Sequence, residues 1–184
     1  MMRMNELKSY DIKFSGLKNG KHQFRFHINQ DFFKQFDFDE FIDSNLDILI
    51  DLNKNDNLLE FNIHSSGTVN IPCDVSGEYY DQKIDGKIDF IVKFGDTYND
   101  DREDLIIIPY NEFKFNIAQQ IYESVVLNVP HKRIHPDILN GNKKVENASY
   151  IINYDDNEDF QKKENTEIDP RWAELKKLIT DKKI

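Results

Sequence analysis

Residues 45–64 read NLDILIDLNKNDNLLEFNIH, and this stretch decides the fold class. Its first half places apolar residues at every second position, at Leu46, Ile48, Ile50 and Leu52. A period of two with acids between the apolar positions predicts a half-buried strand. The polar residues 53–57 predict a turn, and residues 58–64 predict a second strand. Two strands joined so closely predict an antiparallel pair.

The segments on both sides continue this pattern. We predict further strands over residues 6–14, 22–28, 68–73, 84–94 and 105–108. Residues 30–42 predict a short helix or irregular cover capped by Asp31, and residues 116–128 predict a helix that Pro130 ends. The predicted fold class is therefore α+β: an antiparallel β meander or partly closed barrel with two or three helices, and a flexible acidic segment before a C-terminal helix.

The chain divides into three predicted parts. Residues 1–135 form a β-rich α+β domain, and residues 136–168 form a flexible polar linker because apolar residues become sparse there. Residues 169–184 form an amphipathic helix, in which Asp169 caps the N-terminus and Pro170 occupies the first turn. Trp172 on this helix either packs on the domain's own core or anchors a partner, and the sequence leaves both alternatives open.

Composition narrows the classes of partner. The chain has 24 Lys+Arg against 34 Asp+Glu, a formal net charge of −10. This charge disfavours binding to DNA, and any contact with rRNA would need a local basic patch. Fourteen Phe and eight Tyr exclude full disorder. No apolar run approaches the length of a membrane span and the start has no apolar signal core, so we expect a cytoplasmic protein without membrane contact.

Two motifs carry candidate chemistry. Cys73 stands in IPCDVSGE, and a nucleophilic cysteine needs a nearby base, but no histidine has a diagnostic spacing to it. A structural thiol is therefore favoured. His131 and His135 stand in VPHKRIHPD, where a solvated loop, a basic contact to phosphate or acidic protein, and a metal site are all open. Acids on predicted strands, among them Asp51 and Asp89, predict a solvated face rather than a hydrolytic pair.

Four stretches in order, SGLKNGKHQFRFHINQDFF, IPCDVSGE, IYESVVLNVPHKRIH and IDPRWAELKKL, resemble the YceD-like family, also called domain of unknown function 177, in its Bacteroidetes-type members. The resemblance implies a role in large-subunit ribosome biogenesis, in the accumulation of 23S rRNA, with no established enzymatic activity. It places Cys73 at the first cysteine of the family's Cys-x-x-Cys motif and Ser76 at the second. We therefore expect no metal and no cofactor.

The resemblance also assigns candidate binding positions. They are Cys73, Asp74, Glu123, Pro130, His131, Lys132, Arg133, His135, Asp169, Pro170, Arg171 and Trp172. The leading hypothesis is a non-enzymatic ribosome biogenesis factor that binds a basic ribosomal protein or the large-subunit precursor, with rRNA contact as a second route. The alternatives are a Cys-dependent hydrolase that uses Cys73 and a small-molecule-binding barrel.

Overall fold

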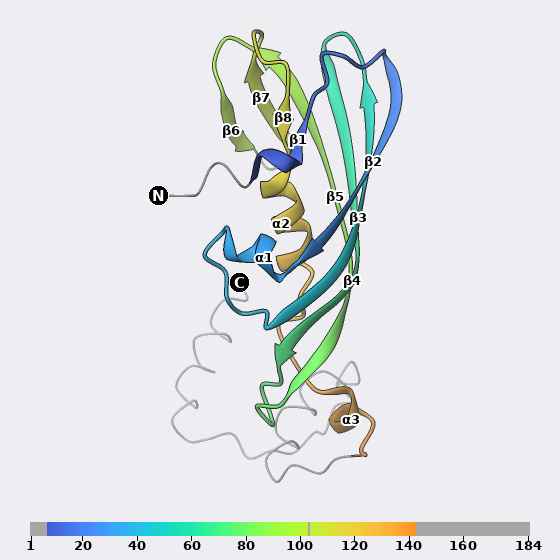
Figure 1. Cartoon of the computed structure of the whole chain (residues 1–184), viewed down its shortest axis with the longest axis vertical. Coiled ribbons are helices and arrows are strands. Elements are labelled where there is room, and N and C mark those ends of the chain that lie inside the picture. Colours follow the sequence, from blue (N-terminus) through green and yellow to red (C-terminus); the bar gives the residue numbers. More distant parts are fainter. Residues whose placement is uncertain (1–6, 103, 143–184) are drawn as a thin grey trace, which may run out of the picture. The chain divides into compact units, whose positions relative to one another are not determined.

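A six-stranded sheet dominates the computed structural model, which describes residues 7–102 and 104–142 (Figure 1). Its strand order is β2-β3-β4-β5-β7-β6. The strands are β2 (Gly20–Asn29), β3 (Asp43–Lys54), β4 (Leu58–Pro72), β5 (Tyr79–Gly95), β6 (Asn99–Arg102) and β7 (Leu105–Pro109). Strands β2 to β5 pair antiparallel with their neighbours in sequence, so the predicted α+β class and its meander are confirmed.

The sheet stays open, so the partly closed barrel is not formed by the described residues. Strands β2 and β6 are its two edges. Strand β7 pairs parallel with β5, and β6 pairs antiparallel with β7. The parallel pair departs from the all-antiparallel expectation because β6 lies between β5 and β7 along the chain. β6 runs opposite to β5, and β7, which turns back from β6, therefore runs in the direction of β5.

Strand β4 is one continuous strand where the sequence predicted two. The Ser65-Ser66-Gly67 stretch resembles a turn, yet it pairs with both β3 and β5 throughout. Gly67 has a φ of 146°, and a Cβ there would overlap the carbonyl oxygen of Asn45 on β3. The glycine therefore serves a close strand-to-strand approach within the sheet and does not end the strand.

One face of the sheet is covered by the two helices α1 (Gln30–Lys34) and α2 (Ala118–Val126) (Figure 1). The side chain of Asn29 caps α1 by accepting from the backbone N–H of Asp31, so the predicted cap residue is wrong by two positions. Helix α2 confirms the predicted helix with shorter ends. Gly86 on β5 lets α2 approach, because a Cβ there would overlap the carbonyl oxygen of Ser124.

The core lies between this face and the helices. Its fully buried large side chains come from every second position of the strands and from both helices: Phe32, Phe33, Ile48, Ile50, Ile63, Val69, Val92, Ile121 and Val125. Burial at this periodicity confirms the alternation that the sequence showed for β3. The opposite face of strands β2 to β5 is covered by none of the described helices (Figure 1).

The N-terminal region differs from its prediction. Residues 6–14 were predicted as a strand, but the structure has a 3-10 helix η1 (Leu7–Tyr10) and a two-residue strand β1 (Asp11–Ile12) that pairs with β8 (Phe115–Asn116). The short strand is fixed by side chains: Lys114 Nζ lies 2.6 Å from Asp11 Oδ2, and the Asn116 amide donates to Asp11 Oδ1. The residues that fix this short strand lie about a hundred positions further along the chain, so the local sequence pattern could not predict it.

Helix α3 (Pro136–Leu139) lies inside the segment predicted as a linker, and its Ile138 is buried. The rest of that segment and the predicted C-terminal helix, with Asp169, Pro170, Arg171 and Trp172, lie outside the described residues. Across the parts that the structure describes, every helix is too short or too polar to cross a bilayer.

Candidate functional site

Cys73 follows β4 and opens the tight turn that leads into β5. Its backbone N–H donates to the carbonyl of Glu78, and its carbonyl accepts from the N–H of Gly77, both at 2.8 Å. Its Sγ accepts a hydrogen bond from the backbone N–H of His135 at 3.2 Å. Cys73 is 2% exposed. The thiol therefore joins the β4–β5 turn to a segment 62 residues further along the chain.

The surroundings of this sulfur favour its thiolate. Burial raises the pKa of the Cys73 thiol. Hydrogen bonding by the Ser76 side chain and by the backbone N–H groups of Ser76, His135 and Val75 lowers the pKa by a larger amount, so the pKa lies below its ordinary value. A low thiol pKa is typical of reactive cysteines only where the sulfur is accessible. Here the sulfur is enclosed, and its hydrogen bonds hold a turn.

The His135 ring is engaged elsewhere. Its Nδ1 accepts from the backbone N–H of Asp137 at 3.1 Å, which caps α3, and the ring lies 5.4 Å from that of Tyr80. A general base must lie within hydrogen-bond reach of the nucleophile. Among the described residues, no hydrogen bond joins the Cys73 sulfur to an imidazole nitrogen.

Asp74 and Arg133 form a second link between the same segments. The N–H of Asp74 donates to the carbonyl of Arg133 at 2.7 Å, and the N–H of Arg133 donates to Asp74 Oδ2 at 2.8 Å. The Arg133 guanidinium pairs with Glu40, which lies between α1 and β3. The basic charge of Arg133 is thus used within the molecule, while Pro130, His131 and Lys132 are exposed.

Glu123 lies apart from this group, on α2. It accepts a hydrogen bond from Gln119 at 2.7 Å. It also lines a hollow of about 1020 Å³ between α2 and strands β5 to β7. The structure therefore brings together Cys73, Asp74, Arg133 and His135, and it places Glu123 at a different surface.

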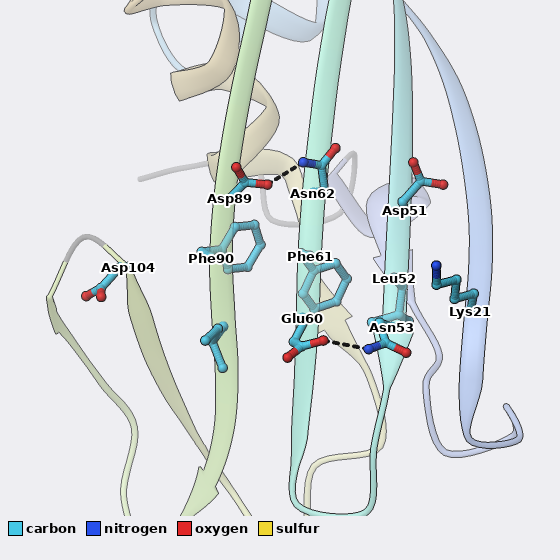
Figure 2. A pocket seen from close by; sticks show the side chains of 11 residues that line it. Lys21, Asp51, Leu52, Asn53, Glu60, Phe61, Asn62, Asp89, Phe90 and Asp104 are labelled. Carbon is cyan, nitrogen blue, oxygen red and sulfur yellow. Dashed lines mark hydrogen bonds between the residues drawn. The ribbon is translucent and has the colours of Figure 1, made fainter.

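A second hollow, of about 740 Å³, opens on the uncovered face of the sheet; we call it the acidic hollow (Figure 2). It is lined by Lys21, Asp51, Leu52, Asn53, Glu60, Phe61, Asn62, Asp89, Phe90, Ile91 and Asp104. Four of these residues carry carboxylates and one carries an ammonium group, so the charge of the hollow is strongly negative. The sequence pointed to Asp51 and Asp89 as outward-facing acids, and both are exposed.

Glu60 and Asp104 were missed. The pairing register of β3, β4 and β5 places Glu60 beside Asn53 and Ile91, and Asp104 precedes β7 at the edge of the same hollow. Strand alternation in residues 58–64 is the signal that could have placed Glu60 on the outward face. Knowing which acids share one surface requires the register, which the 53–57 turn sets for β3 and β4.

A metal centre is not formed by the described residues. Among them, no group of three His, Cys, Asp or Glu side chains lies close enough to hold a metal ion. Ser76 stands at the second position of the Cys-x-x-Cys motif, and its hydrogen bonding lowers the pKa of the Cys73 thiol.

Comparison with known proteins supplies the family. No curated protein and no solved structure gives a significant match to the chain. The sequence model of one family, described as "Large ribosomal RNA subunit accumulation protein YceD", matches residues 61–179. This match covers more than half of the chain and includes most of β4, all of β5, and the Cys73 and Arg133 segments. The chain therefore belongs to the YceD family.

Proposed function

We propose that this chain is a non-enzymatic, cytoplasmic factor that supports the accumulation of 23S rRNA by binding a basic ribosomal protein of the large subunit. The family match over residues 61–179 carries the assignment to large-subunit rRNA accumulation. The choice of a protein as the direct partner rests on charge.

Charge favours a protein over bare RNA on two grounds. The whole chain has a net charge of −10, which repels phosphate at long range. The segment expected to touch rRNA has its Arg133 guanidinium paired with Glu40 and its Arg133 N–H bonded to Asp74. A cation that is already paired gains little from a phosphate, so Arg133 is a weak candidate for contact with rRNA.

The two alternatives receive less support from the geometry. A hydrolase that uses Cys73 needs an accessible sulfur beside a base, but Cys73 is buried and its sulfur accepts the backbone N–H of His135. A binding barrel needs a closed sheet around a cavity. Here the sheet is open, and its core is filled by Phe and aliphatic side chains.

Deletion of the gene tests the proposal directly. We expect the ratio of 23S to 16S rRNA to fall, and a plasmid copy of the wild-type gene to restore it. The Cys73→Ser variant should restore the ratio as well, because a hydroxyl still accepts the N–H of His135. An unchanged ratio in the deletion strain would reject the proposed function.

A further inference from the structure

The acidic hollow lies on a face of the sheet that the described helices leave open. Helices α1 and α2 pack on the opposite face, and Asp51, Glu60 and Asp89 are exposed on β3, β4 and β5 (Figure 2). A hollow on an uncovered sheet face offers surface to a partner. Its chemistry indicates which partner fits.

Three of the four carboxylates of the hollow are held by neutral groups, and the fourth, Asp104, pairs with Arg102. The Gln23 amide donates to Asp51 Oδ1 at 2.9 Å, and the Asn53 amide donates to Glu60 Oε2 at 2.6 Å. The Asn62 amide donates to Asp89 in the same way (Figure 2). Amides orient a carboxylate and leave its charge intact. Within the described part of the chain, no cation forms an ion pair with Asp51, Glu60 or Asp89.

The spacing of these acids matches an extended polypeptide. Asp51 and Asp89 share one row across the sheet, with Asn62 between them. Neighbouring strands are about 4.8 Å apart, so these two acids are roughly 10 Å apart. Glu60 is displaced by two residues along β4, about 7 Å, so it lies roughly 8 Å from each of these two acids. Cations three residues apart on an extended chain span about 10 Å, which matches the separation of Asp51 and Asp89.

Other ligand chemistries fit less well. A metal ion needs converging carboxylates, and no such group exists among the described residues. Phosphate is repelled because the carboxylates of Asp51, Glu60 and Asp89 outnumber the one ammonium group of the hollow, that of Lys21. The half-buried Ile91 beside Glu60 offers an apolar surface along which the methylene stem of a lysine or arginine can pack while its charged end reaches a carboxylate.

We propose that the acidic hollow is the docking surface for an extended segment of a basic protein, whose lysine and arginine side chains contact Asp51, Glu60 and Asp89. This inference rests on the proposed function for its biological partner and adds the surface and the chemistry of the contact. Binding is steered by charge and weakens as the salt concentration rises.

Direct binding to a defined probe tests the inference. The probe is a fluorescent 12-residue peptide in which arginine and lysine alternate with serine and threonine, titrated with the full chain at 50 and 200 mM NaCl. The test variant is the triple substitution Asp51→Asn, Glu60→Gln and Asp89→Asn. Each lost exposed contact is worth about a 1.5- to 5-fold change in affinity, so we expect roughly tenfold weaker binding at 50 mM and a shallower salt dependence.

A matched control removes the same charge elsewhere on the same face. It carries Asp47→Asn, Asp81→Asn and Asp85→Asn, which lie on β3 and β5 outside the hollow and contact His27, Asn70 and His64. We expect this variant to bind the peptide within about twofold of the wild type. Thermal unfolding of both variants shows that each is folded.

The outcomes separate the surface from the function. Three results would each overturn the inference. The peptide could bind both triple variants equally weakly, or it could bind the test variant as tightly as the wild type. The wild type could also bind a 12-nucleotide RNA more tightly than the peptide, with the test substitutions abolishing that binding. Complementation of the deletion strain adds the biological readout, in which the control variant restores the 23S to 16S ratio and the test variant does not. If deletion lowers the ratio and the test variant restores it, the proposed function stands and the docking surface is wrong.

Discussion

Replacement of Cys73 by alanine distinguishes a structural thiol from a nucleophile. The substitution removes the acceptor for the N–H of His135, which then lies beside a methyl group. An unpaired buried N–H costs about 1–3 kcal/mol, and the lost packing of a buried sulfur costs about 1 kcal/mol. We therefore expect a loss of about 2–4 kcal/mol of unfolding free energy. For a chain of this size, Tm falls by about 4–16 °C.

The assay is thermal unfolding followed by circular dichroism, with Cys73→Ser as the control. Serine keeps an acceptor for the same N–H groups, so its Tm should fall by clearly less than that of Cys73→Ala. In the deletion strain, Cys73→Ser should restore the 23S to 16S ratio, while Cys73→Ala should restore it best at low growth temperature. An unchanged Tm in Cys73→Ala together with complete loss of function in both variants would refute this reasoning and indicate a catalytic thiol.

The pH dependence supplies a second test of the same site. The folded-state pKa of Cys73 is lowered, so folding favours the thiolate. The stabilisation that the thiolate gives to the folded state is fully present above the unfolded pKa of about 8.5, and it is lost as the pH falls through the lower folded pKa. The difference in Tm between the wild type and Cys73→Ser should therefore widen from pH 6 to pH 9. A constant difference over this range would contradict the lowered pKa.

Three further predictions concern packing and ion pairs. Gly86→Val should destabilise the domain by about 1–3 kcal/mol or prevent folding, because the new side chain would overlap the backbone of α2 at Ser124; chemical denaturation measures this, and wild-type stability would disprove the close approach. Asp11 has a pKa below its ordinary value, because burial raises the pKa but hydrogen bonds from Lys114 and Asn116 lower it by a larger amount. The ionised Asp11 therefore contributes its full stabilisation above the unfolded pKa of about 3.9, and this stabilisation is lost as the pH falls through the folded pKa. The Tm difference between wild type and Asp11→Asn should be constant from pH 5 to 8 and should shrink below about pH 4. A double-mutant cycle of Arg133→Ala and Glu40→Ala should give a coupling of about 0.5–1 kcal/mol, and zero coupling would mean that the pair does not join the two segments in solution.

Local alternation gave the correct account of the meander. In β2, Phe24, Phe26 and Ile28 turn toward the covered face while Gln23 and Arg25 are exposed, as the period of two predicts. The error at Gly67 has a physical cause. Ser and Gly favour turns when the chain is free to bend, but pairing on both sides of β4 supplies hydrogen bonds that outweigh this preference.

The candidate site was predictable only in part. The exposure of Asp51 and Asp89 follows from alternation. That these two acids share one surface with Glu60 depends on the register across three strands. The hydrogen bond between Cys73 and His135 joins residues 62 positions apart. Such contacts are set by the tertiary fold, and a single sequence contains no local signal for them.

The pairing of β1 with β8 has a consequence for the order of folding. Strands β2 to β5 pair with their neighbours along the chain, so their loops close at small entropic cost and this part can assemble early. Asp11 and Asn116 meet only after the intervening chain has folded, since that pair closes a loop of more than a hundred residues. During synthesis, the N-terminal segment must wait until β8 has left the exit tunnel before its own strand can form.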